Sequence, residues 1–344
     1  MKSLPSTGEK QRLLPKHFVA VVALLLILLL ISVLMSLAFG SRTIGLGGLM
    51  DGLFHPSVES HEASVVRQRI ARTVFGLICG AALGVSGALM QSVTRNPIAD
   101  PSILGVNTGA SLFVVCGIAF FSISSPSEYI WLAIIGAMLT AIFVFGIGSM
   151  GASGATPLKL VLAGAATTAI LSSLVTAIQI PRMNVMDQFR FWQVGSVGSA
   201  SWESVQIFIP FLVVGLVIAL FVAPALNALA LGDEVATGLG VRTGVVRIFA
   251  AFAGVLLCGA ATALAGPIGF IGLLATHVIR LVIGPDVRFL MPLAALCGAI
   301  ILVISDVVGR FLGSPGELEV GILTAFIGAP ILILITMKAK MKSI

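Results

Sequence analysis

Long apolar stretches separated by short polar segments make up almost the whole chain. The first apolar stretch runs from residue 18 to 40, and the others lie at 73–92, 103–121, 129–149, 158–179, 204–225, 245–265, 268–283, 290–309 and 320–337. A helix needs about 20 mostly apolar residues to cross roughly 30 Å of hydrocarbon. The pattern therefore predicts an all-α, polytopic membrane protein with about ten transmembrane helices.

Three stretches need separate interpretation. The stretch 181–204 is too polar to span, and we interpret it as a surface segment with one short interfacial helix followed by Gly-Ser turns. The stretch 266–290 is interrupted by glycine and proline, so its span boundaries are the least regular. The stretch 18–40 is longer than the roughly 7–15 apolar residues of a signal peptide, and we expect it to be retained as a helix.

Composition excludes a soluble protein. The chain is 58% hydrophobic and only 10% charged, whereas soluble domains carry about 25% charged residues. Residues 1–344 are predicted to form a single transmembrane domain that begins with a cytoplasmic tail at 1–17. The four cysteines lie in apolar stretches without CxxC spacing or histidine neighbours, so no metal site is expected.

The distribution of positive charge predicts the orientation of the chain. Ten spans place both termini on the same side of the membrane. If that side is the inside, the inner segments hold 13 of the 20 lysines and arginines, including all seven lysines. Because cytoplasmic loops carry an excess of lysine and arginine, both termini are expected in the cytoplasm.

Small residues recur at intervals of four in the second apolar stretch. Gly76, Gly80 and Gly84 are followed by Gly87 and Ala88. Such a stripe lets two helix backbones approach closely in lipid. We interpret it as helix packing inside one subunit, and a surface that slides during transport is the alternative.

Few ionisable residues lie inside the apolar stretches. Asp306 and Arg310 are four residues apart, so they are expected to pair on one helix. No chain of acidic residues crosses the middle of the spans, which argues against a proton- or sodium-coupled transporter. No lysine follows a glycine, as a nucleotide-binding P-loop requires. With no catalytic constellation either, the chain is predicted not to be an enzyme, and energy must come from a partner.

Four ordered segments resemble one protein family. Residues 69–110 read RIARTVFGLICGAALGVSGALMQSVTRNPIADPSILGVNTGA, and this segment closely resembles the signature of the FecCD-type permeases. Three further matches are LNALALGDEVATGLGV at 226–241, GPIGFIGLLATHVIRLVIGPDVRFLMP at 266–292 and GELEVGILTAFIGAP at 316–330. The chain departs from the family at Ala71, Thr276 and Glu319, where the family has proline. These departures affect a helix entry or bend and leave the family resemblance intact.

The resemblance implies the membrane subunit of an ABC importer in the cytoplasmic (inner) membrane of a bacterium. Ferric siderophores are the expected substrates; cobalamin or haem is the alternative within the family, and a secondary transporter is the alternative from another class. The implied partners are two ATPase subunits, which bind ATP and Mg, a second permease, identical or homologous, an extracytoplasmic substrate-binding protein and membrane lipid. No cofactor on this chain and no nucleic acid are expected.

The polar segment 226–242 is predicted to form one or two short helices at the cytoplasmic face. Acidic residues favour a helix start and glycines favour a helix end. An ordinary connecting loop is the alternative from the residues alone. The resemblance implies that this segment seats in a groove of the ATPase, with coupling through Leu231, Gly232, Asp233, Glu234, Ala236 and Gly240.

The positive charges predicted on the outer side are all arginines. The guanidinium fork binds carboxylates through two parallel hydrogen bonds, so it suits docking to an acidic surface. The resemblance implies that Arg69, Arg72 and Arg310 dock the binding protein. The alternatives are snorkelling to the membrane interface and, for Arg310, a pair with Asp306.

The resemblance also implies a pathway between two permease chains. The hydroxyl residues of the fifth stretch are candidate lining groups, although hydroxyls that serve helix packing are equally compatible with the pattern. These candidates are Thr167, Thr168, Ser172, Ser173 and Thr176.

The polar segment 91–105 is the predicted cytoplasmic turn between the second and third spans. Pro97 and Pro101 disfavour helix at the residues before them, and Asn and Asp side chains bond to nearby backbone in such turns. A purely structural turn is the alternative. The resemblance implies a place at the inner mouth of the pathway, where Asn96, Pro97 and Ile98 are the expected gate, facing the turn at 151–157.

Overall fold

The computed structural model describes residues 15–40, 44–55, 60–123, 125–150 and 157–341, and these residues form helices and connecting turns with no strand among them. The helices are α1 (Pro15–Ala38), α2 (Leu46–Phe54), α3 (His61–Thr94), the 3₁₀ turn η1 (Pro101–Leu104), α4 (Val106–Phe121), α5 (Pro126–Gly148), α6 (Pro157–Gln179), α7 (Met183–Val194), α8 (Trp202–Leu229), α9 (Asp233–Gly238), α10 (Thr243–Ala265), α11 (Ile271–Ile283), α12 (Val287–Leu312) and α13 (Val320–Met341).

Each of the ten predicted apolar stretches coincides with one of these helices. Within the described residues, seven helices are long and apolar enough to cross a membrane: α1, α3, α5, α6, α8, α10 and α12. The apolar helices α4, α11 and α13 are shorter in their described apolar parts. The all-helical membrane fold is therefore confirmed, while the count of ten spans and the side of the termini stay predictions.

Two elements differ from the hydropathy pattern. Helix α3 begins at His61, well before the apolar stretch at 73, because Ser60 caps it by accepting a hydrogen bond from the backbone N–H of Ala63 at 3.1 Å. Helix α2 was not predicted, since it is too short to span and rich in glycine. It packs against the start of α3. Hydropathy misses both features because it detects long apolar segments and reports neither helix caps nor short helices.

The predicted short helix in 181–204 is present as α7 (Met183–Val194). Gly195 ends it with a φ of 80°, a left-handed backbone value that favours glycine. Its backbone N–H donates to the carbonyl of Trp192 at 3.3 Å. The helix and the turn that follows it agree with the prediction.

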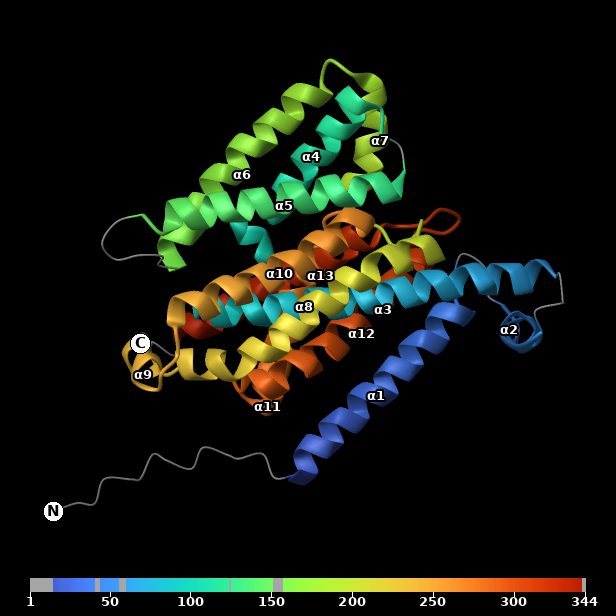
Figure 1. Cartoon of the computed structure of the whole chain (residues 1–344). Helices are drawn as coiled ribbons and strands as arrows, with labels where there is room; N and C mark the ends of the chain where they lie inside the picture. Colours follow the sequence, from blue (N-terminus) through green and yellow to red (C-terminus); the bar gives the residue numbers. More distant parts are fainter. Residues whose placement is uncertain (1–14, 41–43, 56–59, 124, 151–156, 342–344) are drawn as a thin grey trace.

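Helix α3 is the central element of the bundle (Figure 1). It packs on α12, α10, α11 and α8. Helix α1 packs on α12 and, over a smaller area, on α3. Helices α4, α5, α6 and α7 form a separate layer, which joins the rest through contacts of α4 and α5 with α10. The molecule therefore consists of a main bundle around α3 and a second layer that packs on α10.

The glycine stripe of α3 lies against neighbouring helices of the same chain. A Cβ on Gly80 would stand 2.5 Å from the carbonyl oxygen of Gly298 on α12. A Cβ on Gly84 would overlap the carbonyl of Ala294, and one on Gly87 would meet Gly272 of α11 at 2.5 Å. Backbones this close have no room for larger side chains. The predicted packing inside one subunit is confirmed.

Candidate functional site

Two groups of predicted site residues lie at opposite ends of α3. Arg69 and Arg72 lie in its first half, and the predicted gate residues Asn96, Pro97 and Ile98 follow Arg95, which caps its end. At 1.5 Å per residue, Arg72 and Arg95 are roughly 35 Å apart along the helix, close to the thickness of a bilayer core. We describe the first group as the arginine cluster, which consists of Arg69, Arg72, Arg310, Asp306 and Glu317.

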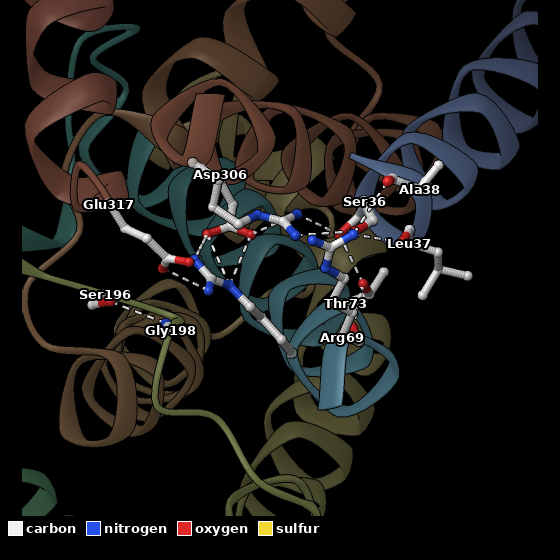
Figure 2. Close-up of polar contacts among 11 residues, drawn as sticks. Ser36, Leu37, Ala38, Arg69, Thr73, Ser196, Gly198, Asp306 and Glu317 are labelled. Atoms are coloured by element: carbon white, nitrogen blue, oxygen red, sulfur yellow. Dashed lines mark hydrogen bonds and ion pairs between the residues drawn. The ribbon is translucent and has the colours of Figure 1, made fainter. Parts of the chain in front are cut away.

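Arg72 bonds to both acids of the arginine cluster, Asp306 and Glu317, which are labelled in Figure 2. Its Nε donates to Asp306 Oδ1 and Oδ2 at 3.2 and 3.1 Å, and its Nη2 donates to Oδ1 at 2.7 Å. Its Nη1 donates to Glu317 Oε2 at 2.7 Å. Asp306 is buried, whereas the Glu317 side chain is 39% exposed. Arg72 therefore joins α3 to α12 and to the turn before α13.

Arg310 is the most deeply buried member of the arginine cluster, with 2% of its surface exposed. Its Nη2 lies 3.2 Å from Asp306 Oδ2, so the predicted pair at four-residue spacing is confirmed. Its Nη1 donates to the carbonyl of Ser36 at 3.1 Å, and its Nη2 donates to Ser36 Oγ at 2.9 Å. Ser36 also shares a hydrogen bond with Thr73 at 2.8 Å. Arg310 thus fixes the end of α1 against α12.

Arg69 bonds to backbone at the end of α1. Its Nη1 donates to the carbonyls of Leu37 and Ala38 at 3.0 and 3.2 Å, as Figure 2 shows. These are terminal helix carbonyls without partners inside the helix. Arg69 is 8% exposed. The family resemblance implies that Arg69, Arg72 and Arg310 dock a partner; in this structure their guanidiniums bond within the chain, and the docking role stays a prediction.

A cavity of about 670 Å³ opens beside the arginine cluster. It is lined by members of the cluster and by the segment 198–202 before α8. Arg67 also lines the cavity, so four guanidiniums and two carboxylates leave an excess of two positive charges beside it. The cavity therefore favours an acidic group.

The turn predicted as a gate has the expected local bonding. Asn96 Oδ1 accepts a hydrogen bond from the backbone N–H of Ile98 at 3.1 Å, and Asp100 Oδ1 accepts one from Ser102 at 2.9 Å. Ile98 is exposed. Asn96, Pro97 and Ile98 follow directly on the end of α3 at Arg95. Most of the facing turn at 151–157 lies outside the described residues.

The segment predicted to couple with the ATPase forms the short helix α9. The helix begins at Asp233 and Glu234, as acidic residues at a helix start predict, and Gly240 follows its end with a φ of 81°. Leu231 and Leu239 are exposed, at 65% and 63%. The predicted coupling residue Ala236 is fully buried, so it supports the helix from inside while the leucines face outward.

Asp233 is shared by two arginines. Arg247 of α10 donates from Nη2 to its Oδ1 at 2.9 Å and to its Oδ2 at 3.0 Å, and Arg95 Nη2 also contacts Oδ1. Partial burial raises the pKa of Asp233, but the hydrogen bond and the charge of Arg247, with those of Arg95, outweigh it and hold the pKa below its ordinary value. The carboxylate is therefore charged at neutral pH.

The five candidate lining residues of α6 separate into two groups. Thr167 is buried, and its hydroxyl donates to the carbonyl of Ala163 at 2.7 Å. Thr168 is half-buried. Ser172, Ser173 and Thr176 are exposed on a face that no described part of this chain covers. The hydroxyls of Ser173 and Thr176 also donate to carbonyls of their own helix, at 2.9 Å each, so exposure alone separates the three outer residues from Thr167.

Several residues of these sites are not predictable from the sequence pattern. Ser36, Thr73 and Arg247 have no local signal, because their partners are far away along the chain. Glu317 had a signal, since it is an acid in the same predicted outer region as three arginines. Three arginines predicted on the outer side need acidic partners on that side, and Glu317 is such an acid.

Comparisons with known proteins agree on one class of protein, the permeases of iron and siderophore transport systems. The model of the FecCD transport family matches residues 28–338. The ferric enterobactin transport system permease protein FepD of Escherichia coli (strain K12) is 41% identical over 311 residues, which are 90% of this chain and 92% of that protein. The iron(3+)-hydroxamate import system permease protein FhuB of Bacillus subtilis (strain 168) is 38% identical over 334 residues, 96% of this chain and 86% of that protein.

A solved structure supports the same class. It is an inward-facing conformation of a metal-chelate type ABC transporter, similar to this chain with a TM-score of 0.80 and 27% identity. The match covers 93% of this chain and 99% of that one. The likeness thus extends over nearly the whole chain.

Proposed function

This chain belongs to the FecCD transport family, and from that premise we propose that it is the permease subunit of a binding-protein-dependent ABC importer that moves ferric siderophores into the cytoplasm. The observation that carries the proposal is the 41% identity with a ferric enterobactin permease over 90% of the chain. The chain performs no covalent chemistry. It provides the path, and its partners provide the energy.

In the proposed assembly, two permease chains, identical or homologous, pair in the bacterial cytoplasmic membrane above two ATPase subunits. ATP and Mg bind to the ATPases. A P-loop cradles phosphate through a Gly-rich backbone and a lysine, and this chain has no such sequence. Both termini, α9 and the turn at 95–98 lie on the cytoplasmic side, and the arginine cluster lies on the outer side.

Transport then follows alternating access between the two permease chains. A binding protein delivers the ferric siderophore outside, and nucleotide binding and hydrolysis move α9 with the ATPase surface on which it rests. The exposed hydroxyls of α6 line the path, because a large polar chelate needs hydrogen-bonding groups that hold no fixed charge. Asn96, Pro97 and Ile98 close its inner mouth.

Docking of the binding protein is proposed to use the three arginines Arg69, Arg72 and Arg310, with Arg72 as the principal contact. Arg72 is the arginine whose exposed partner, Glu317, can be exchanged for an acid of another protein. Asp306 remains as a buried second partner and fixes the guanidinium plane. Glu317 therefore competes with the binding protein for one face of Arg72.

The substitution Glu317→Gln is expected to strengthen docking. It frees Arg72 Nη1, now bonded at 2.7 Å, so affinity for the cognate binding protein should rise about two- to five-fold, the size of an exposed ion pair. Surface plasmon resonance on permease in lipid nanodiscs measures this change, and high salt should reduce it. Glu203→Gln, an exposed acid in the first turn of α8, is the matched control. Unchanged or weaker binding in Glu317→Gln contradicts docking through Arg72.

The gate proposal predicts that Asn96→Cys forms a disulfide across the permease dimer in one nucleotide state and not in the other. A disulfide needs Cα atoms within about 7 Å, so only a closed inner mouth permits it. The assay uses a background in which the native free cysteines, Cys79, Cys116, Cys258 and Cys297, are replaced. Asn184→Cys on α7, exposed at the other end of the bundle, is the control. No crosslink at residue 96 in any nucleotide state counts against the gate.

The substrate is tested by uptake in cells. A strain that lacks this gene is loaded with radiolabelled ferric siderophores, haem or cobalamin, with and without the gene restored. The proposal expects uptake of one or more ferric siderophores to depend on the gene while haem and cobalamin uptake do not. If only haem or cobalamin uptake depended on it, the siderophore assignment would be wrong and the importer class would stand.

A further inference from the structure

Three charged side chains from three elements meet at the end of α3 that lies opposite the arginine cluster. Asp233 is the first residue of α9, Arg95 directly follows the last residue of α3, and Arg247 lies in the first half of α10. The Asp233 carboxylate contacts both arginines. No part of the proposed docking or pathway so far uses this contact.

The backbone at Arg95 makes this contact specific. Arg95 has a φ of 51°, in the left-handed region that residues other than glycine enter at a cost. A residue in this conformation ends the helix and turns the chain toward Asn96. The side chain of the same residue reaches Asp233. One residue therefore begins the gate turn and holds the start of α9.

The two arginines hold Asp233 differently. Arg247 contacts both carboxylate oxygens and is 23% exposed, whereas Arg95 contacts one oxygen and is 36% exposed. Helix α9 also packs directly on α8 and α10. Arg247 is thus the anchor of α9 on α10, and Arg95 is the partner that can separate from Asp233 or return to it.

We infer that Asp233 is a positioning residue that transmits movement of α9 to the gate turn Arg95–Ile98. The inference rests on the proposed function, because it presumes that an ATPase moves α9. When α9 shifts with the ATPase, the Asp233 carboxylate either pulls on the Arg95 guanidinium or leaves it. The end of α3 and the three gate residues after it move accordingly.

Because this ion pair is partly exposed, it can form and break during transport more readily than a buried ion pair that stabilises the fold. Partly exposed ion pairs contribute little to folding stability. Two cations around one carboxylate also mean that Arg95 can leave without stranding a buried charge, since Asp233 keeps Arg247. The contact can therefore form and break in each cycle while the fold is retained. Its loss should alter the transmission of movement and leave the assembly intact.

The test measures uptake and ATP hydrolysis together in the complete importer, reconstituted in proteoliposomes with its ATPase and binding protein. The variants are Asp233→Asn and Arg95→Gln, with Asp233→Glu as the conservative variant. Arg288→Gln is the matched control, because Arg288 forms an exposed ion pair with Asp286 at 2.9 Å. Asp286 also accepts a hydrogen bond from Asn227 near the end of α8, so this pair lies at the same end of the bundle.

We expect Arg95→Gln to assemble and hydrolyse ATP, but to spend at least about five-fold more ATP for each substrate moved, the lower end of typical allosteric coupling. Asp233→Asn should raise the same ratio. Asp233→Glu should return toward the parent ratio, and Arg288→Gln should equal it. An unchanged ratio in Arg95→Gln overturns the inference, even if Asp233→Asn is impaired, because the link to the gate requires Arg95. An equal rise in Arg288→Gln also overturns it.

Two further readouts keep the inference separate from the proposed function. If Asp233→Asn fails to assemble, Arg95→Gln decides, because α9 keeps its Arg247 contact. If the parent complex shows no ATP-driven uptake of ferric siderophores, the proposed function fails. The link is then decided by Asn96→Cys crosslinking with and without nucleotide: Asp233→Asn should remove the nucleotide dependence, and a dependence that persists overturns the inference.

Discussion

Replacing Asp306 by Asn is expected to destabilise the permease by about 3–5 kcal/mol, the usual effect of removing one partner of a buried ion pair. The Asp306 carboxylate accepts three hydrogen-bond contacts from Arg72 and lies 3.2 Å from Arg310 Nη2. Arg310 is 2% exposed. Without the carboxylate, one or both cations stay buried with partners too few to balance the loss of hydration.

Reversible unfolding in mixed detergent micelles, titrated with a denaturing detergent, measures this loss. The matched control is Asp187→Asn, which removes an exposed carboxylate 3.6 Å from Arg190 on α7 and should cost less than about 1 kcal/mol. If Asp306→Asn unfolds at the same detergent fraction as the control, the arginine cluster does not hold α1, α3 and α12 together.

The second large effect is expected at α9. The double substitution Leu231→Glu with Leu239→Glu places two charges on the exposed apolar residues that flank this helix. If α9 seats in the ATPase, each charge is forced into an apolar interface. Loss of such anchor contacts costs about 2 kcal/mol or more, so affinity for the ATPase should fall at least about 30-fold. Uptake should fall to background.

Co-purification of the ATPase with tagged permease, followed by titration of ATPase onto permease in nanodiscs, measures the effect. Met183→Glu on α7 is the matched control, because Met183 is an equally exposed apolar residue, at 65%, outside α9. Normal ATPase binding by the double variant, with a folded bundle, contradicts the seating of α9 in the ATPase. Loss of binding in Met183→Glu as well indicates a general loss of folding.

The helices were predictable because each membrane span requires about 20 consecutive, mostly apolar residues, which are visible along the sequence. Apolar length alone locates α5, α6 and α10 to within a few residues. Local spacing also predicts the Asp306–Arg310 pair and the acidic start of α9, since both depend on residues within one helical turn. These features require no knowledge of which helices are neighbours.

The partners of the arginines were not predictable in this way. Arg72 meets Asp306 across 234 positions, and Arg310 meets Ser36 across 274. Such contacts depend on how α3, α12 and α1 cross, and the glycine stripe shows only that a close crossing exists, without naming its partner. The sequence therefore suggested outward-facing arginines, while the fold buries Arg69 and Arg310 against α1.

The central claim is that this chain carries ferric siderophores with energy from a partner ATPase. It is tested most directly by the purified importer in proteoliposomes, with radiolabelled ferric siderophore supplied on its binding protein and ATP supplied to the ATPase side. We predict accumulation of the label that requires this chain, the binding protein and ATP hydrolysis together, and that persists when proton and sodium gradients are collapsed. Accumulation that proceeds without ATP and follows an ion gradient would contradict the account.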